Sequence, residues 1–267
     1  AGAAAVGAGG TVFAGRREAE DLTTPVIEVA LPRLPRALDG YKIVQLSDVH
    51  IGPLLGARFL ERVVDVANAQ KPDLVVITGD LVDAPVKTLA PDFKVLSRLA
   101  ARHGVVFVTG NHEYYSGAEE WVAWLRANGI RVLMNERMEI GDAGASFDLA
   151  GIPDKQGGMF FADHEPDLAR ALAGRDPERE LVLLAHRPSQ IEMARGHGVG
   201  LHLAGHTHGG QLWPFGALVR LTEPYVSGLH THDDGTQIYV SRGTGSWGPP
   251  LRIANPAEIG QIVLTRR

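Results

Sequence analysis

The sequence contains no cysteine among its 267 residues. Disulfide bonds and thiolate metal sites are therefore excluded, and any bound metal must be held by histidine, aspartate or asparagine. Nitrogen and oxygen ligands of this kind suit Mn, Fe or Zn. The absence of cysteine fits a cytoplasmic protein and an exported one equally well, so it does not decide between them.

Basic residues are also too few to give the chain a positive charge. Lysine and arginine total 26 against 31 aspartates and glutamates, which leaves a net charge of −5 at pH 7. Such a chain has no general attraction to nucleic acid or to an anionic membrane. We therefore expect no nucleic-acid partner. The apolar content of 45% and charged content of 21% are those of an ordinary globular protein.

The N-terminal segment has no charge in its first 15 residues, AGAAAVGAGGTVFAG, and is too short to span a bilayer. Two interpretations stay open: the remnant of a removed signal or membrane anchor, and a disordered low-complexity tail. We expect residues 1–21 to be such a tail and residues 22–267 to form one domain. A location in the cell envelope or at a membrane surface is expected first, and a cytoplasmic one second.

The most informative stretch is the apolar run Leu74-Val75-Val76-Ile77, which leads directly into Thr78-Gly79-Asp80. A run of this kind is typical of a strand buried on both faces. A carboxylate at the carboxyl end of such a strand lies where open α/β sheets bind their ligands. Taken alone, a Gly-Asp pair after a strand is equally typical of an ordinary turn.

The same pattern occurs four more times. Apolar runs around residues 43–46, 105–108, 181–184 and 199–204 lead into Ser47-Asp48-Val49-His50, Thr109-Gly110-Asn111-His112-Glu113, Ala185-His186 and Gly205-His206-Thr207-His208. Because strand ends of this kind meet at one edge of a sheet, we expect the polar residues to converge. The sequence therefore predicts a metal site there.

The remaining periodicity predicts an α/β fold with one two-layered sheet core and helices outside. Helical spacing predicts helices at residues 57–69, 91–102, 163–173 and 188–195, and another with Ser116 as its N-cap. Further strands are expected at residues 26–31, 131–134, 138–140, 147–152, 237–241 and 260–265. The three strands between 131 and 152 follow one another without helices, so local antiparallel pairing is expected there.

Seven residues at the strand ends are candidate metal ligands: Asp48, His50, Asp80, Asn111, His186, His206 and His208. One tetrahedral ion takes only four ligands. Seven suit two ions that share a bridging carboxylate, and two ions roughly 3.5–4 Å apart can clamp the attacking and leaving oxygens of a phosphoryl transfer. We therefore expect two divalent metal ions as cofactors.

The order of these motifs resembles that of the calcineurin-like metallophosphoesterases, from Tyr41 to the C-terminus. The matching motifs are Asp48-x-His50, Gly79-Asp80-x-x-Asp83, Gly110-Asn111-His112-Glu113, His186 and Gly205-His206-x-His208. Residues 47–52 and 205–211 are similar to a branch with membrane-associated or exported bacterial phosphoesterases. The sequence departs from that branch at His202, where an acidic residue is expected.

The resemblance implies a fold and a set of roles. The fold is a two-layered β-sheet sandwich flanked by helices. The first ion is held by Asp48, His50 and His208, and the second by Asn111, His186 and His206, with Asp80 bridging both. His112 is implied to face the scissile phosphate and to protonate the leaving oxygen, while Asp83 orients its ring. A histidine beside two cations has a reason to be held by a carboxylate.

The other polar residues receive simpler interpretations. His202 lies inside an apolar run and is expected in the core. Glu113 either supports a ligand or continues its turn. Five histidines without a strand-end setting are expected at the surface, and these are His103, His164, His197, His230 and His232.

Three aromatic segments lie close to the motifs in the sequence: Tyr114-Tyr115, Trp213-Pro214-Phe215 and Trp247-Gly248-Pro249-Pro250. Their glycine and proline neighbours are typical of loops, and loops at strand ends border the ligand site. Aromatic side chains there suit an apolar or sugar portion of a substrate. Trp213 has the alternative of filling the core beneath its loop.

The function expected from these residues is two-metal hydrolysis of phosphodiester or pyrophosphate bonds in small or amphiphilic substrates, such as lipid- or sugar-linked ones. A membrane surface is a candidate partner. One alternative is a nuclease of the same superfamily, which a broad basic stripe would favour, but the sequence has none. Another is a non-catalytic metal-binding scaffold or sensor, which loss of ligands or of His112 would indicate, yet every position is filled.

Overall fold

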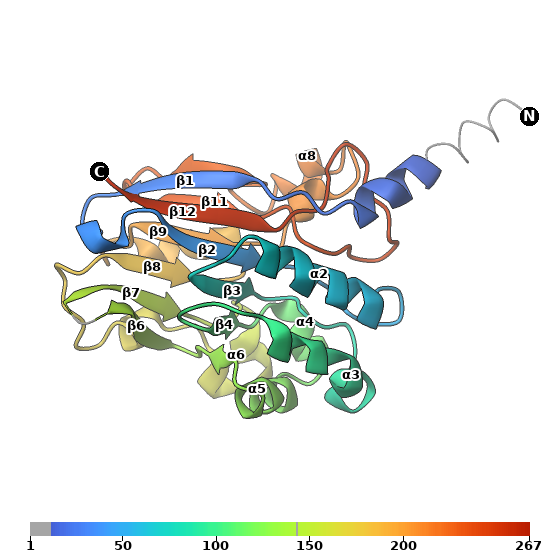
Figure 1. Cartoon of the computed structure of the whole chain (residues 1–267), viewed down its shortest axis with the longest axis horizontal. Coiled ribbons are helices and arrows are strands. Elements are labelled where there is room, and N and C mark those ends of the chain that lie inside the picture. The colour runs from blue at the N-terminus through green and yellow to red at the C-terminus, as the bar shows by residue number, and fades with distance from the viewer. Residues whose placement is uncertain (1–11, 143) are drawn as a thin grey trace, which may run out of the picture.

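Two six-stranded β-sheets face each other in the computed structural model, which describes residues 12–142 and 144–267 (Figure 1). The first sheet has the order β1 (Val26–Leu31), β12 (Gly260–Arg266), β2 (Tyr41–Leu46), β3 (Leu74–Thr78), β4 (Val105–Val108), β5 (Arg131–Val132). The second has the order β10 (Gly228–Thr231), β11 (Gln237–Val240), β9 (Leu201–Ala204), β8 (Leu181–Leu184), β7 (Ala145–Gly151), β6 (Glu136–Asp142). The predicted two-layered sandwich is confirmed.

Strand β3 shows why a continuous apolar run is required in this sandwich. Its side chains alternate between the faces of the sheet, as in any strand. Leu74 and Val76 pack between the two sheets, whereas Val75 and Ile77 pack against the outer helices, and all four are fully buried. Neither face meets water, so no polar residue alternates with the apolar ones.

Helices cover the outer faces of both sheets. The first sheet is covered by α2 (Ala57–Ala69), α3 (Val86–Phe93) and α5 (Ala118–Ala127), and the second by α7 (Leu168–Ala171) and the 3₁₀ helix η4 (Pro188–Ala194). The apolar residues of α2 recur at three- and four-residue spacing, and Leu60, Val63, Val64 and Ala67 are buried. Each helix therefore buries one apolar face, which gives the αββα layering.

The other helical segments are short and lie in the connections. They are α4 (Asn111–Tyr115), α6 (Gly157–Phe160), α8 (Gly216–Val219) and the 3₁₀ helices η1 (Arg36–Leu38), η2 (Lys94–Arg98), η3 (Ala162–His164) and η5 (His208–Gly210). Among the described residues, no helix has the length and apolar character needed to cross a bilayer.

Strand directions explain where the polar residues meet. Strands β2, β3 and β4 are mutually parallel, and so are β7, β8, β9 and β11. Parallel strands bring their carboxyl ends to one edge of the sheet. A hydrogen bond joins the two sheets there, because Gln45 Nε2 of β2 donates to the carbonyl of Ala204 at the end of β9 (2.9 Å), and it also donates to Thr78 Oγ1 of the neighbouring β3 (2.8 Å).

Several expected elements differ from those observed. The helix expected at 91–102 is α3 followed by η2, with Pro91 inside α3. Ser116 ends α4 and does not begin α5, whose N-cap is Gly117 at φ +93°, a conformation that favours glycine. The segment 163–173 forms two short turns, η3 and α7, and 188–195 is 3₁₀ rather than α. Antiparallel pairing is confirmed for β6 and β7, but β5 pairs with β4 in parallel.

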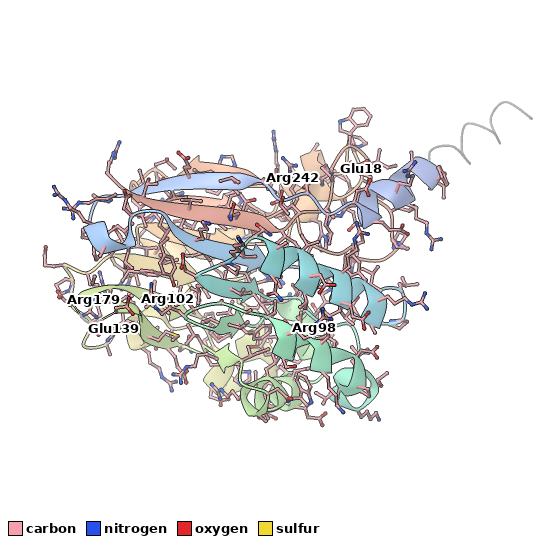
Figure 2. The ribbon with its side chains drawn as sticks, in the orientation of Figure 1. Glu18, Arg98, Arg102, Glu139, Arg179 and Arg242 are labelled. Carbon is pink, nitrogen blue, oxygen red and sulfur yellow. The ribbon has the colours of Figure 1, made fainter. Side chains whose placement is uncertain are left out.

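Residues 12–20 form an N-terminal helix that packs against the late loops (Figure 2). The Glu18 carboxylate accepts hydrogen bonds from the backbone N–H groups of Ala254 (3.0 Å) and Asn255 (2.5 Å). The Arg252 N–H donates to the carbonyl of Gly15 at 2.9 Å. Residues 1–11 of the expected tail lie outside the described residues, and a domain boundary at residue 22 stays a prediction.

The histidines outside the motifs are not all at the surface. His103, His197 and His230 are half-buried, whereas His164 and His232 are buried at 8% exposure, so the surface prediction is wrong for these two. His164 packs against Tyr114 and Phe161. His202 is fully buried, as expected, and its Nε2 donates to the carbonyl of Ala185 at 3.1 Å.

Burial lowers the pKa of His202 from 6.5 to about 4, because the charged ring cannot be solvated between the strands. The unfolded chain therefore binds this proton at a pH where the folded chain does not, and stability falls as pH drops from about 6.5 towards 4. Between pH 7 and pH 5 the wild type should lose about 2 kcal/mol more stability than His202→Leu. Urea titrations of both proteins in chelator would measure this difference, and parallel pH profiles would contradict it.

Candidate metal centre and active site

An unusual backbone conformation is shared by most of the candidate ligands. Asp48, His50, Asp80, His206 and His208 all have φ between +50° and +70°. This left-handed region costs a non-glycine residue roughly 1–2 kcal/mol. Strain of this kind collects at functional sites, where the surrounding structure holds residues in otherwise unfavourable positions. The strand ends are therefore shaped to aim these side chains at one place.

Glycines next to the ligands allow the strand ends to approach closely. A Cβ atom on Gly110 would lie 2.2 Å from Asp80 Oδ1, and one on Gly205 would lie 1.9 Å from Ser47 Oγ. No side chain fits at either position without moving the ligands. The glycines in the Gly110-Asn111 and Gly205-His206 motifs therefore have a steric role.

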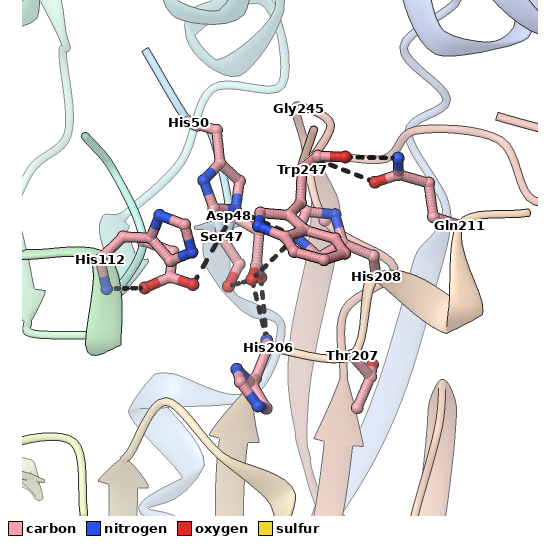
Figure 3. Close-up of polar contacts among 12 residues, drawn as sticks. Ser47, Asp48, His50, His112, His206, Thr207, His208, Gln211, Gly245 and Trp247 are labelled. Atoms are coloured by element: carbon pink, nitrogen blue, oxygen red, sulfur yellow. Dashed lines mark hydrogen bonds and ion pairs between the residues drawn. The ribbon is translucent and has the colours of Figure 1, made fainter. Parts of the chain in front are cut away.

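One cluster consists of Asp48, His50 and His208, whose donor atoms lie within 4.8 Å of one another (Figure 3). His50 Nε2 and His208 Nε2 are 3.0 Å apart, and His208 Nε2 is 3.5 Å from Asp48 Oδ1. The three side chains come from both sheets, since Asp48 and His50 follow β2 and His208 follows β9. Three buried donors at these distances could hold one cation.

A second cluster consists of Asp80, His186 and His206. His186 Nε2 lies 3.1 Å from Asp80 Oδ2 and 3.2 Å from His206 Nδ1. Asn111 begins α4 beside them, and its buried Oδ1 has no hydrogen-bond partner among the residues that the structure describes. An unpaired buried amide oxygen is costly, so it points to a ligand that is supplied from outside the protein.

Asp80 lies between the two clusters. Its Oδ1 accepts a hydrogen bond from the His112 N–H at 2.8 Å, which fixes the carboxylate. Its Oδ2 faces His186 Nε2 of one cluster at 3.1 Å and His50 Nε2 of the other at 3.9 Å. A single oxygen is therefore directed at both groups of candidate ligands.

Hydrogen bonds to their outer nitrogens set the tautomers of two histidines. His50 Nδ1 is 2.8 Å from Asp83 Oδ1, and His186 Nδ1 is 2.7 Å from the carbonyl of Thr78. Both partners are acceptors, so each Nδ1 carries a proton, and in its neutral form each ring presents the Nε2 lone pair to its cluster. Metal-ligating histidines are oriented in this way by carboxylates and carbonyls.

Two arginines stand beside the outer nitrogens of the other histidines. Arg187 Nη1 donates to His206 Nε2 at 2.9 Å, and Arg252 Nη2 lies 3.4 Å from His208 Nδ1. Burial and neighbouring positive charge lower the pKa of both His206 and His208, which keeps the rings neutral, as a metal ligand must be. The Arg187 contact leaves the proton of the neutral His206 ring on Nδ1, so a neutral ring could bind a cation through Nδ1 only if this proton moved to Nε2 and the Arg187 contact changed.

The clustered carboxylates favour positive charge in the centre. Burial alone would lower the pKa of His186, but Asp80 and Asp48 outweigh it and raise the value to about 10. The pKa of Asp80 is held well below its usual range by His186 and His50 despite its burial. Two divalent metal ions would fit this site. They would bind the converging donor atoms and the unpaired Asn111 oxygen, and they would supply the positive charge that the carboxylates stabilise.

His112 faces the same cavity from the start of α4. Its Nδ1 lies 2.7 Å from Asp83 Oδ1, and its ring stands edge-on to that of His50. Asp83 and Asp80 raise the pKa of His112 although burial opposes the shift. The expectation that Asp83 holds this ring agrees with the contact, but the same Asp83 oxygen also holds His50.

Glu113 acts on the ligands through the backbone. Its fully buried carboxylate accepts hydrogen bonds from the N–H groups of Asp80 (3.0 Å), Leu81 (2.8 Å) and Gly110 (2.6 Å). It therefore ties the end of β3 to the end of β4 and holds Asp80 in its left-handed conformation. Of the two interpretations left open by the sequence, support of a ligand is the one that these contacts favour.

Sequence reasoning missed the arginines and their partners. Arg252 is fully buried, and its guanidinium donates to the carbonyls of Gly243 (3.1 Å) and Gly245 (2.5 Å). Arg187 is held by the buried Asp154 at 2.7 Å. The position of Arg187 directly after His186 was a usable signal, whereas nothing in the sequence places Arg252 beside His208.

A cavity of about 600 Å³ opens over the candidate metal centre. Its floor is lined by Asp80, Asn111, His112 and three of the cluster histidines, His50, His206 and His208, whereas His186 is buried beneath it. Its wall is aromatic and apolar, and is formed by Tyr115, Leu212, Phe215, Val219, Trp247 and Pro249. Gln211 holds the wall in place, because its side-chain amide donates to the Trp247 carbonyl (2.8 Å) and accepts from the Trp247 N–H (2.9 Å; Figure 3). Trp213 is 74% exposed and therefore does not fill the core.

Comparison with known proteins assigns the family. The family model of the calcineurin-like phosphoesterases matches residues 41–210, well over half of the chain. The chain therefore belongs to the calcineurin-like phosphoesterase family, as its motifs indicated.

Two curated relatives match along most of the chain. An uncharacterized metallophosphoesterase from Helicobacter pylori is 39% identical over 253 residues, which are 92% of this chain and 65% of that protein. A transmembrane protein with metallophosphoesterase domain from Danio rerio is 39% identical over 245 residues, 89% of this chain and 56% of that protein. The chain thus spans less than two thirds of the length of these relatives.

The solved structure of the NAD nucleotidase NadN from Haemophilus influenzae has a similar fold. The TM-score is 0.52 at 18% identity, over 77% of this chain and 50% of that one. At this identity the likeness concerns the fold alone.

Proposed function

We propose that the protein is a two-metal phosphoesterase that hydrolyses phosphodiester or pyrophosphate bonds of small or amphiphilic substrates. The observation that carries the proposal is the position of Asp80 Oδ2 between two groups of buried donors at the floor of one cavity. Family membership supports the same class of reaction.

In this proposal Asp48, His50 and His208 hold one ion, Asn111, His186 and His206 hold the other, and Asp80 bridges them. The ions, when bound, supply Lewis acidity towards the phosphoryl oxygens and lower the pKa of water. Glu113, Arg187 and Arg252 act on this set indirectly, because each contacts the backbone or the outer nitrogen of a ligand.

The proposed role of His112 is that of a general acid. Asp83 accepts from Nδ1–H at 2.7 Å, so the ring presents Nε2 towards the cavity. Asp83 also favours the protonated ring, whose Nε2–H can be given to the leaving oxygen of the ester. Asp83 thus acts as a positioning residue for both His112 and His50.

The cavity wall supports the substrate class. Its apolar and aromatic side chains can pack on an acyl, alkyl or sugar portion of a substrate while the phosphoester lies over the floor. A long polyanion finds little attraction in a chain with a net charge of −5. We further propose association with a membrane surface, and a domain that begins at about residue 22 after a short tail.

Metal analysis combined with a substrate panel tests the function. The chain is stripped with chelator, reloaded with Mn, Fe or Zn, and assayed on mono-, di- and pyrophosphate esters with short and long apolar groups. Turnover should return with about two ions per chain. Phe215→Ala should raise KM about tenfold for long-chain diesters and leave the smallest diester unchanged.

Two results would overturn this proposal. Tight metal binding without turnover on any ester would indicate a scaffold or sensor. Efficient cleavage of single-stranded DNA or RNA that collapses with rising salt would indicate a nuclease.

A further inference from the structure

Uncharged loops surround the mouth of the cavity. Residues 209–222 and 243–251 contribute side chains to it, and residues 51–57 contribute to a smaller pocket beside it that shares His50, His112 and Trp247. Arg220 is the only charged residue in these three segments. At the average charged content of the chain, 21%, about six charges would be expected among 30 residues. These loops therefore lack the composition of ordinary water-facing segments.

Large apolar side chains are exposed on the same loops, and together we call them the apolar rim. Its members are Leu54, Trp213, Phe215, Leu218, Leu221 and Trp247, with exposures between 54% and 80%. Phe215 and Trp247 line the cavity, whereas Trp213, Leu218 and Leu221 are exposed outside its lining. Apolar side chains gathered around one opening are uncommon on a soluble surface and mark an interaction site.

The N-terminal helix extends this surface. Two large apolar side chains of this helix are exposed, Val12 (54%) and Phe13 (66%). Gly15 accepts a hydrogen bond from the N–H of Arg252, and the next residue, Ile253, accepts one from the N–H of Trp213 at 3.1 Å. The helix therefore lies beside the apolar rim, and Figure 1 shows it at the same end of the molecule as α8.

We propose that the apolar rim inserts into the interfacial layer of a lipid bilayer, so that the cavity mouth opens onto the membrane surface. Membrane binding by the rim does not depend on the proposed activity, because vesicle binding can be measured without turnover. Only its role in delivering an amphiphilic substrate rests on the proposed function.

The chemistry of the rim favours lipid over a second protein chain. The rim is made of separate loop tips around an opening, and a protein seated on it would close the route to the metal centre. Exposed tryptophan beside aliphatic residues is typical of the boundary between headgroups and acyl chains. The six rim side chains are uncharged, Arg220 is the single charge of the three loop segments, and the adjacent Glu223 lines the cavity but is buried. The rim therefore offers a partner no set of ion pairs, and its attraction is to an apolar layer.

Vesicle flotation of the full chain tests the proposal. The protein should float with phosphatidylcholine vesicles, and binding should be nearly equal at 0.1 M and 0.5 M salt because few charges are involved. Leu218→Ser/Leu221→Ser should lower the partition coefficient about 100-fold. The matched control is Val26→Ser/Met159→Ser, which removes two apolar side chains of similar exposure, on β1 and α6, and should bind like the wild type.

A second measurement keeps the test decisive if the leucine variant folds poorly. Tryptophan fluorescence of the unmodified chain should be quenched by brominated phosphatidylcholine, since Trp213 and Trp247 would lie among the lipids. Hydrolysis of a small soluble diester should be equal in both double variants. This assay therefore distinguishes loss of the proposed activity from loss of membrane binding.

Three outcomes would overturn the inference. One is absence of both flotation and quenching in the wild type. Another is equal vesicle binding by the two double variants. The third is a dimer in solution that the leucine substitutions dissociate without any vesicle binding, which would make the rim a contact between two copies of the chain.

Discussion

Replacing Asp80 by asparagine should empty both metal sites and lower kcat/KM by about 10³-fold or more. The structure gives the reason. Asp80 Oδ1 accepts from the His112 N–H at 2.8 Å, so the amide oxygen of asparagine would take that position. Its NH₂ group would then replace Oδ2, the atom that faces His186 and His50. A donor without negative charge would point at both ions.

Metal content per chain separates this effect from damage to one site. His50→Ala removes a ligand of the first ion only and should leave the second largely in place. Asp73→Asn is the matched control, because Asp73 lies at the opposite end of β3 and accepts from the N–H of Lys42. It should keep both ions. Equal metal loss in Asp80→Asn and His50→Ala would rule out the bridging geometry.

The convergence of the strand ends was predictable from the sequence. Five apolar runs end in aspartate, asparagine or histidine, and a run such as Leu74 to Ile77 needs burial on both faces. Parallel pairing then places the polar residues at one edge. Burial can be inferred from each run alone, and the polar residue at its end marks the edge at which the parallel strands β2, β3, β4, β8 and β9 finish.

The supports of the site were not predictable, because they depend on contacts distant in sequence. Asp83 reaches His50 because the segments after β2 and β3 run side by side, with Ile51 bridged to Val82, and it also reaches His112, which follows β4. Arg252 meets His208 across 44 residues. Periodicity within one segment carries no information about such neighbours.

Local errors had a similar origin. Residues 188–194 have helical spacing, yet they form a 3₁₀ helix over the second sheet, with Ile191 and Ala194 buried. His232 has polar neighbours in the sequence but is buried beneath Tyr225 and Arg195, whose side chains contact its two ring nitrogens. The polar neighbours of His232 in the sequence predicted an exposed side chain, but tertiary packing buries it.

Replacing His112 by glutamine should lower kcat by roughly 10²-fold or more, while the fold and most of the metal remain. Glutamine can still contact Asp83, but it cannot donate a proton as an imidazolium does. His103→Gln is the matched control: His103 is half-buried, bonded to the Tyr41 hydroxyl and remote from the cavity lining. Its activity should be that of the wild type.

Asp83→Asn should combine two losses, since one Asp83 oxygen contacts Nδ1 of both His112 and His50 at 2.7 and 2.8 Å. Loss of the carboxylate should lower kcat through His112. It should also lower the affinity for the first ion about 10- to 100-fold, because His50 would lose the carboxylate that orients its ring. The family resemblance implied a role of Asp83 towards His112 alone, and metal titration of the variant distinguishes that expectation from a role towards both histidines.

The alternative is that His112 is itself a ligand. His50, Asp80 and His112 also place donor atoms within 4.8 Å of one another, so the geometry offers this group as well. The contact with Asp83 places a proton on Nδ1 of His112 but does not show whether Nε2 is protonated. A neutral ring would present a lone pair that can bind metal, whereas a charged ring would present a proton that can be donated. Metal content of His112→Gln does decide it. If the variant loses an ion in parallel with its activity, His112 binds metal and the proton donor must be sought elsewhere in the cavity.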